Sequence, residues 1–343
     1  MFAALKTLCL GLLLAAIPNA QAQTAAPEPT PSKRLVVVVD GIAALRNFPV
    51  LVAERLGYLD GSDYRVTVMD IRPEVGIDEM VADGRADAGI AYWHHTVAMQ
   101  AAGKPMAAVV TMGVTPGAKL MVANRLAGKI HSPASLSGLR IVAGGPYSAK
   151  TTVANAAVMA GGHGPADYVR LAPEDKQSIA ALLRDGKADL VVARTPDGSF
   201  YEEQGVATLF ADLTTVESTR RTLGALFPTT AVYMTQARID ADPGAAQHLA
   251  TAFVKTLAYI RSHSAEEVAA LIPEQIVGPD RAAYVRALAE SMAMYQNNGL
   301  MPTGAAEFEL KVLQAAVPAY ASVRPEQTYT NAFAARALQG AGQ

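Results

Sequence analysis

Two segments of the chain repeat one pattern, and this repeat constrains the fold more than any other feature. They are "EMVADGRADAGIAYWHH" (79–95) and "ALLRDGKADLVVARTPD" (181–197). Each holds an apolar helical end, Asp-Gly, a basic residue, Ala-Asp and a short apolar run. The pattern predicts a helix that stops at Gly84 or Gly186, because glycine readily takes the left-handed conformation that ends helices, and then a strand. The copies are too far apart for a solenoid, so we interpret them as equivalent parts of two α/β lobes.

The segments around each copy extend this interpretation. The runs "AGIAY" and "LVVA" are uniformly apolar, which is typical of strands covered on both faces in a parallel sheet. Other predicted strands are "RLVVVVD", "YRVTVMD" and "PMAAVVTM" in the first lobe, and "GLRIVAGG", "YVRLA" and "ATLFADL" in the second. We expect "AKLMVAN" and "PTTAVYMT" to be two strands that cross between the lobes. From Pro243 onward the apolar spacing is helical, and these helices should pack on the first lobe.

The start of the chain has the composition of a secretory signal peptide. Lys6 precedes the apolar run "LCLGLLLAAI", and the small residues Ala20 and Ala22 follow Pro18. This predicts cleavage near Ala22 and export, with a membrane anchor as the alternative. Residues 1–22 are then the signal peptide and 23–33 a disordered, Pro-rich lead-in. We assign 34–118 plus 230–335 to lobe 1 and 119–229 to lobe 2.

Cysteine content and charge narrow the classes of function. The only cysteine, Cys9, lies in the predicted signal peptide, so the mature chain should have no disulfide and no thiol nucleophile. An exported protein of this kind suggests a bacterial periplasm. The formal net charge of −2 gives no basic footprint for nucleic acid, so the expected partner is small. We expect no cofactor and no metal, because the neighbouring histidines 94 and 95 have no partners at ligand spacing.

Several segments together resemble a known family. They are "FPVLVAERLGYL", "MVADGRADAGIA", "AMQAAGKPMAAVV", "SPASLSGLRIVAGG" and "ALLRDGKADLVVA", in this order between Arg34 and about Thr235. The chain is similar to the extracytoplasmic solute-binding proteins of ABC importers for nitrate, sulfonates, taurine and related molecules. The resemblance implies a type II periplasmic binding protein fold: two α/β lobes joined by two crossing strands, with the C-terminal helices packing on the first lobe. The stretch "YWHH" stands where the family has smaller residues, so the substrate is not copied from a relative.

In such a fold the ligand lies between the lobes, at the carboxyl ends of the strands and the amino ends of the helices, where an anion is well held. In the first lobe the candidates follow the strands: Asp40, Asn47 and Phe48, then Tyr92, Trp93 and His94, and finally Thr111. Asp40 is equally expected as a turn residue before Gly41, and Phe48 as a core residue. Only one of the adjacent Tyr92 and Trp93 should face the ligand.

In the second lobe the stretch "GGPYSAKTT" opens a predicted helix. Its candidates are Tyr147, Ser148, Lys150 and Thr151, or Thr152 in place of Thr151. Backbone N–H groups and hydroxyls there suit a sulfonate, carboxylate or nitrate, although Ser148 is also a common helix cap and Lys150 a solvated residue. Arg194, after the second copy of the repeat, is a candidate clamp for a carboxylate or a surface residue.

The leading interpretation is a monomeric periplasmic binding protein that captures a small organic anion and delivers it to an ABC permease in the inner membrane. Aromatic candidates favour an organic sulfonate or carboxylate, while nitrate and a neutral heterocycle stay open. One alternative is an enzyme, because desulfinases and pyrimidine-forming enzymes resemble the same fold. The other is a sensor subunit of a receptor.

Overall fold

The computed structural model describes residues 33–71, 76–296 and 298–340. The predicted signal peptide (1–22) and residues 23–32 of the predicted lead-in lie outside the described residues. Lys33, the last residue of that lead-in, already begins the first strand. No helix in the described ranges is long and apolar enough to cross a membrane.

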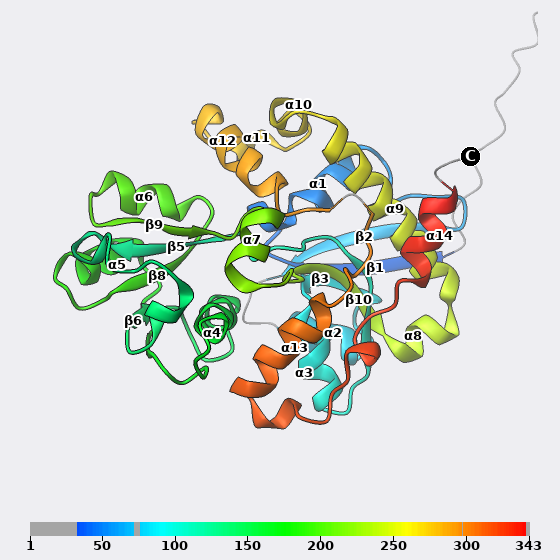
Figure 1. Cartoon of the computed structure of the whole chain (residues 1–343). Coiled ribbons are helices and arrows are strands. Elements are labelled where there is room, and N and C mark those ends of the chain that lie inside the picture. The colour runs from blue at the N-terminus through cyan, green and yellow to red at the C-terminus, as the bar shows by residue number, and fades with distance from the viewer. Residues whose placement is uncertain (1–32, 72–75, 297, 341–343) are drawn as a thin grey trace, which may run out of the picture. The chain divides into compact units, whose positions relative to one another are not determined.

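The first sheet contains five strands in the order β2-β1-β3-β10-β4 (Figure 1). They are β1 (Lys33–Asp40), β2 (Tyr64–Ile71), β3 (Ala88–Tyr92), β4 (Met106–Thr111) and β10 (Thr230–Thr235). Strand β1 pairs in parallel with β2 and β3, whereas β10 runs antiparallel to β3 and β4.

The second sheet repeats this topology in the order β7-β6-β8-β5-β9. Its strands are β5 (Ala118–Ala123), β6 (Arg140–Val142), β7 (Val169–Leu171), β8 (Leu190–Arg194) and β9 (Ala207–Asp212). Strand β6 pairs in parallel with β7 and β8, and β5 runs antiparallel to β8 and β9. The two copies of the repeated pattern therefore supply β3 and β8, which hold the same position in the two sheets.

We expected β3 and β8 to lie inside parallel sheets, and this expectation was wrong. Strands β3 and β8 are buried, but each lies between one parallel and one antiparallel neighbour. The antiparallel neighbours, β10 and β5, are the two segments predicted as crossings. The chain leaves the first sheet after the carboxyl end of β4 and the second sheet after the carboxyl end of β9. It enters the other sheet at the edge where the parallel strands have their carboxyl ends. The entering strand, β5 or β10, therefore runs antiparallel to them. The carboxyl ends of the parallel strands of both sheets thus face the connecting segments 112–117 and 213–229.

The helices surround these two sheets (Figure 1). They are α1 (Phe48–Arg55), α2 (Ile77–Ala82), α3 (His94–Ala101), α4 (Ala149–Ala160), α5 (Lys176–Arg184), α6 (Asp197–Glu203), α7 (Val216–Leu223), α8 (Gln236–Ala241), α9 (Pro243–Ser262), α10 (Ala265–Ala269), α11 (Glu274–Val277), α12 (Arg281–Met292), α13 (Ala305–Ala316) and α14 (Ala332–Gly340). As predicted, α9 and α14 pack on the first sheet, where both contact β4. Helix α13 also contacts α4 of the second sheet, so the C-terminal helices touch both halves.

The aspartates of the repeated pattern make the same connection in both sheets. The N–H of Asp87 donates to the carbonyl of Val36 (2.8 Å), and its carboxylate accepts the N–H of Val36 (2.7 Å). Asp189 makes both bonds to Arg140 at the same distances. Each aspartate directly precedes its strand, β3 or β8, and thus extends the pairing of that strand with β1 or β6 by one residue. Just upstream, Gly84 (φ 71°) and Gly186 (φ 68°) supply the left-handed turns that the sequence predicts.

Asp189 is expected to stabilise the second sheet measurably. Burial raises the pKa of its carboxyl, but the hydrogen bonds from Arg140 and Arg125 outweigh burial and lower it to about 2. Because the pKa is lower in the folded state, the stabilisation is present above about pH 4 and is lost as the pH falls toward 2. We expect Asp189→Asn to lower the free energy of unfolding by about 2 kcal/mol at neutral pH.

Urea unfolding at neutral and acidic pH checks this expectation, with Asp185→Asn as the control. Asp185 has an exposed side chain and pairs with Lys187 at the surface, so its substitution should change the free energy by less than about 0.5 kcal/mol. Equal effects of the two substitutions would contradict the assigned role of Asp189.

Candidate functional site

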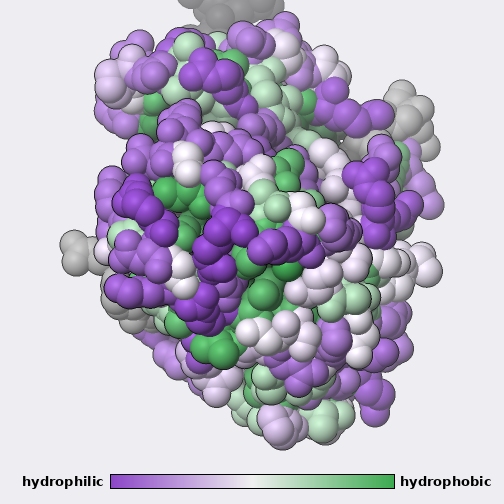
Figure 2. Space-filling view, turned by 60° about the vertical axis from the view of Figure 1, so that its left-hand side comes forward, coloured by the Kyte–Doolittle hydropathy of each residue, from purple (hydrophilic) through white to green (hydrophobic). Residues whose placement is uncertain are grey.

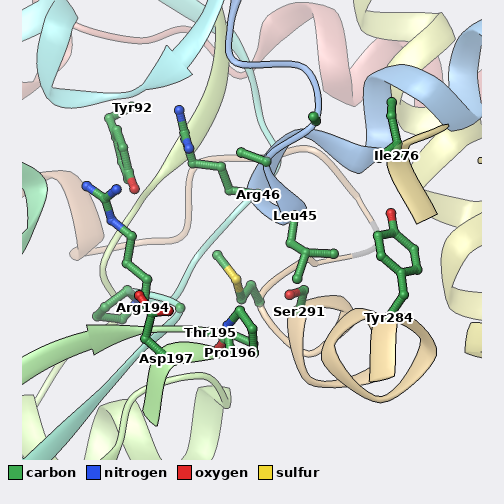
Figure 3. Close-up of a pocket in the computed structure, with 15 residues that line it drawn as sticks. Leu45, Arg46, Tyr92, Arg194, Thr195, Pro196, Asp197, Ile276, Tyr284 and Ser291 are labelled. Carbon is green, nitrogen blue, oxygen red and sulfur yellow. The ribbon is translucent and has the colours of Figure 1, made fainter. Parts of the chain in front are cut away.

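A pocket lies where the two sheets are connected. Its volume is about 430 Å³, which suits a small organic molecule. The lining residues come from the β1–α1 connection, the end of β3, the first connecting segment, the end of β8 and the α11–α12 region (Figure 3): Ala43, Ala44, Leu45, Arg46, Tyr92, Pro116, Gly117, Arg194, Thr195, Pro196, Asp197, Ile276, Tyr284, Ser291 and Met294. We call it the larger pocket. Both sheets contribute to it through the carboxyl ends of their strands.

Arg46 is held in place on the first-sheet side of the larger pocket. One guanidinium nitrogen, Nη2, donates to the carbonyl (2.7 Å) and to the carboxylate (3.0 Å) of Asp40. The guanidinium carbon lies 5.5 Å from the centre of the Tyr92 ring, a distance at which a cation and an aromatic face attract each other. The hydroxyl of Tyr295 donates to the backbone carbonyl of Arg46. The Nε atom of Arg46 is buried with no hydrogen-bond partner among the described residues, so the group keeps an unused donor.

Arg194 is the second cation of the larger pocket and comes from the other sheet. It is the last residue of β8, and its side chain points toward Tyr92 in Figure 3. Arg194 is exposed, and within the described ranges no carboxylate forms an ion pair with it. Asp197 is the acidic residue of the lining. Because Asp40 pairs with Arg46, Arg194 is the cation of this wall that is left to pair with an anion.

The opposite wall is mostly apolar. Figure 3 shows Tyr284 and Ile276 on this wall, across the pocket from the two arginines. Leu45 and Met294 add apolar surface to the lining. Ser291 also lines this wall, but its hydroxyl donates to the carbonyl of Ala287 (2.9 Å). The arrangement can hold an anionic group on one side and an organic body on the other.

The sequence between residues 46 and 267 matches the model of a family described as NMT1/THI5 like. The chain belongs to this family. No curated protein matches the sequence.

Solved structures share the fold. A protein from Bordetella bronchiseptica RB50 is 27% identical, with 90% of this chain and 98% of that chain covered and a TM-score of 0.72. The alkanesulfonate-binding protein SsuA from Xanthomonas axonopodis pv. citri, solved with bound MOPS, is 15% identical, with 88% and 100% covered and a TM-score of 0.63. The desulfurization enzyme DszB is 14% identical, with 90% and 100% covered and a TM-score of 0.61.

Of the residues predicted from the sequence, this NMT1/THI5-like protein brings Tyr92 and Arg194 together in the larger pocket. Asp40 lies just behind the wall as the ion-pair partner of Arg46. Asn47 is fully buried, and its amide donates to the carbonyls of Asp40 (2.7 Å) and Gly41 (3.0 Å), which fixes the β1–α1 connection.

Four other predicted first-lobe positions do not line the larger pocket. Phe48 is buried in the core and meets Tyr295 edge to face, with ring centres 5.2 Å apart. Trp93 is fully buried against the first sheet, and Thr111 is buried at the end of β4. Of the adjacent aromatic pair, Tyr92 therefore faces the pocket and Trp93 faces the core. His94 points into a different, smaller cavity near α13.

The predicted residues around the start of α4 lie apart from the larger pocket. Ser148 is the N-cap of α4: its hydroxyl accepts from the Thr151 N–H (3.2 Å) and donates to the Ala143 carbonyl (2.9 Å). Thr151 is buried and donates within the same turn. Lys150 pairs with Glu174 at 2.8 Å, and Tyr147 is exposed beside the smaller cavity. Their roles in binding stay predictions.

Sequence reasoning missed Arg46 and the α11–α12 wall. Arg46 lies inside "DGIAALRNFP", a segment expected to face the ligand, and it is the one charged residue there that follows the turn. This isolation in an apolar stretch was a usable signal. The contribution of Ile276, Tyr284 and Met294 depends on tertiary packing of a distant segment, for which the sequence has no local signal.

The described part of the chain contains no group of three or more His, Cys, Asp or Glu side chains that could hold a metal ion. The surface is also divided: on the face in Figure 2, hydrophobic residues form short patches between hydrophilic ones. The arginines and tyrosines of the larger pocket offer charge and hydrogen bonding.

The two arginines should differ in their effect on folding. Arg46→Gln removes the partner of Asp40 and the cation over Tyr92, so we expect it to lower the free energy of unfolding by about 1–2 kcal/mol. Arg194→Gln removes an exposed cation that forms no ion pair with the described residues, and it should change this free energy by less than about 0.5 kcal/mol. Urea denaturation of both variants measures the difference. A large loss in Arg194→Gln alone would mean that Arg194 has a structural role.

Proposed function

We propose that this protein is the solute-binding component of an ABC importer and that it captures a small organic anion in the larger pocket. The observation that carries the proposal is the pair Arg46 and Arg194. Arg46 comes from the β1–α1 connection of the first sheet and Arg194 from the end of β8 in the second, and both line one pocket beside Tyr92. Guanidinium groups bind carboxylates and sulfonates through paired, charge-assisted hydrogen bonds.

The origin of the two arginines also supports a capture mechanism. An anion that contacts Arg46 and Arg194 at once touches both sheets, and these contacts are complete only when the two halves close on it. Binding then favours the closed arrangement, because a ligand shifts an equilibrium toward the state in which it has more contacts. A permease can recognise the loaded protein by that arrangement.

The dimensions of the larger pocket favour an organic ligand over a small inorganic one. Nitrate would fill a small part of about 430 Å³, whereas an organic sulfonate or carboxylate could place its body against Leu45, Ile276 and Tyr284. The SsuA protein of similar fold was solved with MOPS, a sulfonate with an organic ring. A neutral heterocycle would leave Arg194 without a counter-charge, whereas Arg46 already pairs with Asp40.

The cellular setting is part of the proposal. We infer export by the N-terminal segment, a periplasmic location, a monomeric state and transient contact with an inner-membrane permease. The signal-like sequence of residues 1–22 and membership of the NMT1/THI5-like family support this setting.

A thermal-shift screen tests the function. The protein is heated with aliphatic and aromatic sulfonates, carboxylates, nitrate and neutral pyrimidines. A true ligand at 100 times its Kd should stabilise the folded state by about 2.7 kcal/mol. Arg194→Gln should weaken binding about 10- to 100-fold, the effect of losing a charge-assisted hydrogen bond. Arg184→Gln, an exposed arginine outside the larger pocket, is the matched control and should bind like the wild type.

The fold shared with DszB makes an enzyme the alternative function. Each compound that stabilises the protein is therefore incubated with it and recovered for mass spectrometry. Unchanged recovery supports the binding protein. Conversion of the compound, or stabilisation by neutral pyrimidines but by no anion, would overturn the proposed function.

A further inference from the structure

Helix α13 buries an acidic residue that the larger pocket does not use. Glu309 is fully buried, and neither carboxyl oxygen has a hydrogen-bond partner among the described residues. Its Oε1 lies 3.4 Å from Nδ1 of His94 on α3. A buried carboxyl group with no full hydrogen bond is unfavourable by about 1–3 kcal/mol, so its presence calls for a reason other than stability.

The surroundings set the charge of both partners. Burial raises the pKa of Glu309 well above its usual range. Burial, and secondarily the nearby His95, lowers the pKa of His94 to about 3, against a smaller opposing effect of Asp78. Both directions favour an uncharged pair at neutral pH: a carboxylic acid and a neutral imidazole. In this state the carboxyl O–H of Glu309 is the donor that faces Nδ1 of His94 across the 3.4 Å contact.

This arrangement fixes what the other ring nitrogen can do. A neutral imidazole carries one proton, and if Nδ1 accepts from Glu309, that proton is on Nε2. If the shared proton moves from Glu309 to Nδ1, Nε2 still carries its own. His94 therefore presents an N–H donor at Nε2 wherever the shared proton lies.

The Nε2 atom has a cavity in front of it. His94 lines a smaller cavity of about 30 Å³ together with Tyr147, Thr152, Asn155, Leu313 and Tyr320. Nδ1 is buried and faces Glu309, which leaves Nε2 as the ring nitrogen accessible from this side. The side-chain oxygen of Asn155 accepts a hydrogen bond from the Tyr168 hydroxyl (2.9 Å), and its amide N–H₂ is a donor beside the cavity. Both groups are donors, and donors suit an acceptor oxygen.

The smaller cavity is close to the larger pocket. Tyr92, which lines the larger pocket, stacks on His94 with ring centres 5.4 Å apart and planes at 12°. The smaller cavity has room for about two water-sized groups, so it fits one polar group of a ligand and not a whole molecule.

We infer that Glu309 is a positioning residue that fixes His94 as a hydrogen-bond donor, and that the smaller cavity takes a second acceptor oxygen of the bound anion. This inference rests on the proposed function and deepens it. The preferred ligands are then anions with an additional carbonyl, hydroxyl or acid oxygen, such as oxo acids, hydroxysulfonates and diacids.

The first test needs no ligand. The full chain with ¹⁵N-labelled histidine side chains is studied by NMR at neutral pH, and His94→Gln assigns the His94 signals among the six histidines. We expect the proton on Nε2, with Nδ1 unprotonated or sharing the Glu309 proton. Glu309→Gln keeps an N–H donor to Nδ1 and should preserve this state, whereas Glu309→Leu should give a mixture of tautomers. An Nδ1–H tautomer with bare Nε2 in the wild type, or no change in Glu309→Leu, would overturn the role of Glu309.

The second test concerns the ligand. Calorimetry compares pyruvate with propionate, isethionate with ethanesulfonate, and succinate with butyrate. We expect the wild type to bind one oxygen-bearing member at least 10-fold more tightly than its partner, and Glu309→Leu to lose that preference while Glu309→Gln keeps it. Equal affinity within every pair would overturn the ligand assignment. Absence of binding by any anion would overturn the proposed function as well, while the NMR result still decides the role of Glu309 separately.

Discussion

The paired hydrogen bonds of Asp87 and Asp189 are the interaction on which the rest of the structure depends. Each aspartate binds the N–H and the C=O of one residue on the neighbouring strand, Val36 or Arg140, and so fixes the register between a strand and the strand before it in the sheet. A slip by one residue would place apolar side chains of β3 or β8 on the opposite face. Because both strands end at the larger pocket, the same bonds set the positions of Tyr92 and Arg194.

The order of strands then determines where a ligand can bind. The chain passes between the sheets twice, and each time it leaves from the carboxyl end of a strand. All carboxyl ends of the parallel strands therefore face the region of the connections, together with the loops that follow them. Open α/β sheets bind ligands at these ends. The repeated pattern thus brings residues from two distant parts of the sequence to one place. No single stretch of the chain has to contain the whole binding site.

The sequence predicted the parts that local patterns control. The apolar runs, the glycine stops and the Ser148 cap are all set by neighbours in the chain, and all are present. The antiparallel direction of β5 and β10 was not predicted, because it depends on the route of the chain between sheets. For the larger pocket, position after a strand selected Tyr92 and Arg194 as candidates, and both line it. It could not separate Tyr92 from the buried Trp93, nor find Glu309, whose helix reads as an ordinary amphipathic segment.

The two halves of the larger pocket differ in how far they are organised before a ligand arrives. The Arg46 side chain is held by Asp40 and by the face of Tyr92, and the Tyr295 hydroxyl fixes its backbone carbonyl, so much of its side-chain freedom is already lost in folding. Arg194 is exposed and has no ion-pair partner in the described part of the chain, so it must be ordered by the ligand itself. Preorganised groups discriminate between ligands because a poor fit is not relieved by movement, whereas ordering a free side chain opposes affinity by about 0.5–1.5 kcal/mol. We therefore expect Arg46, on the side of the first sheet, to decide which ligands bind. The ordering of Arg194, on the side of the second sheet, should couple ligand binding to the proposed closure.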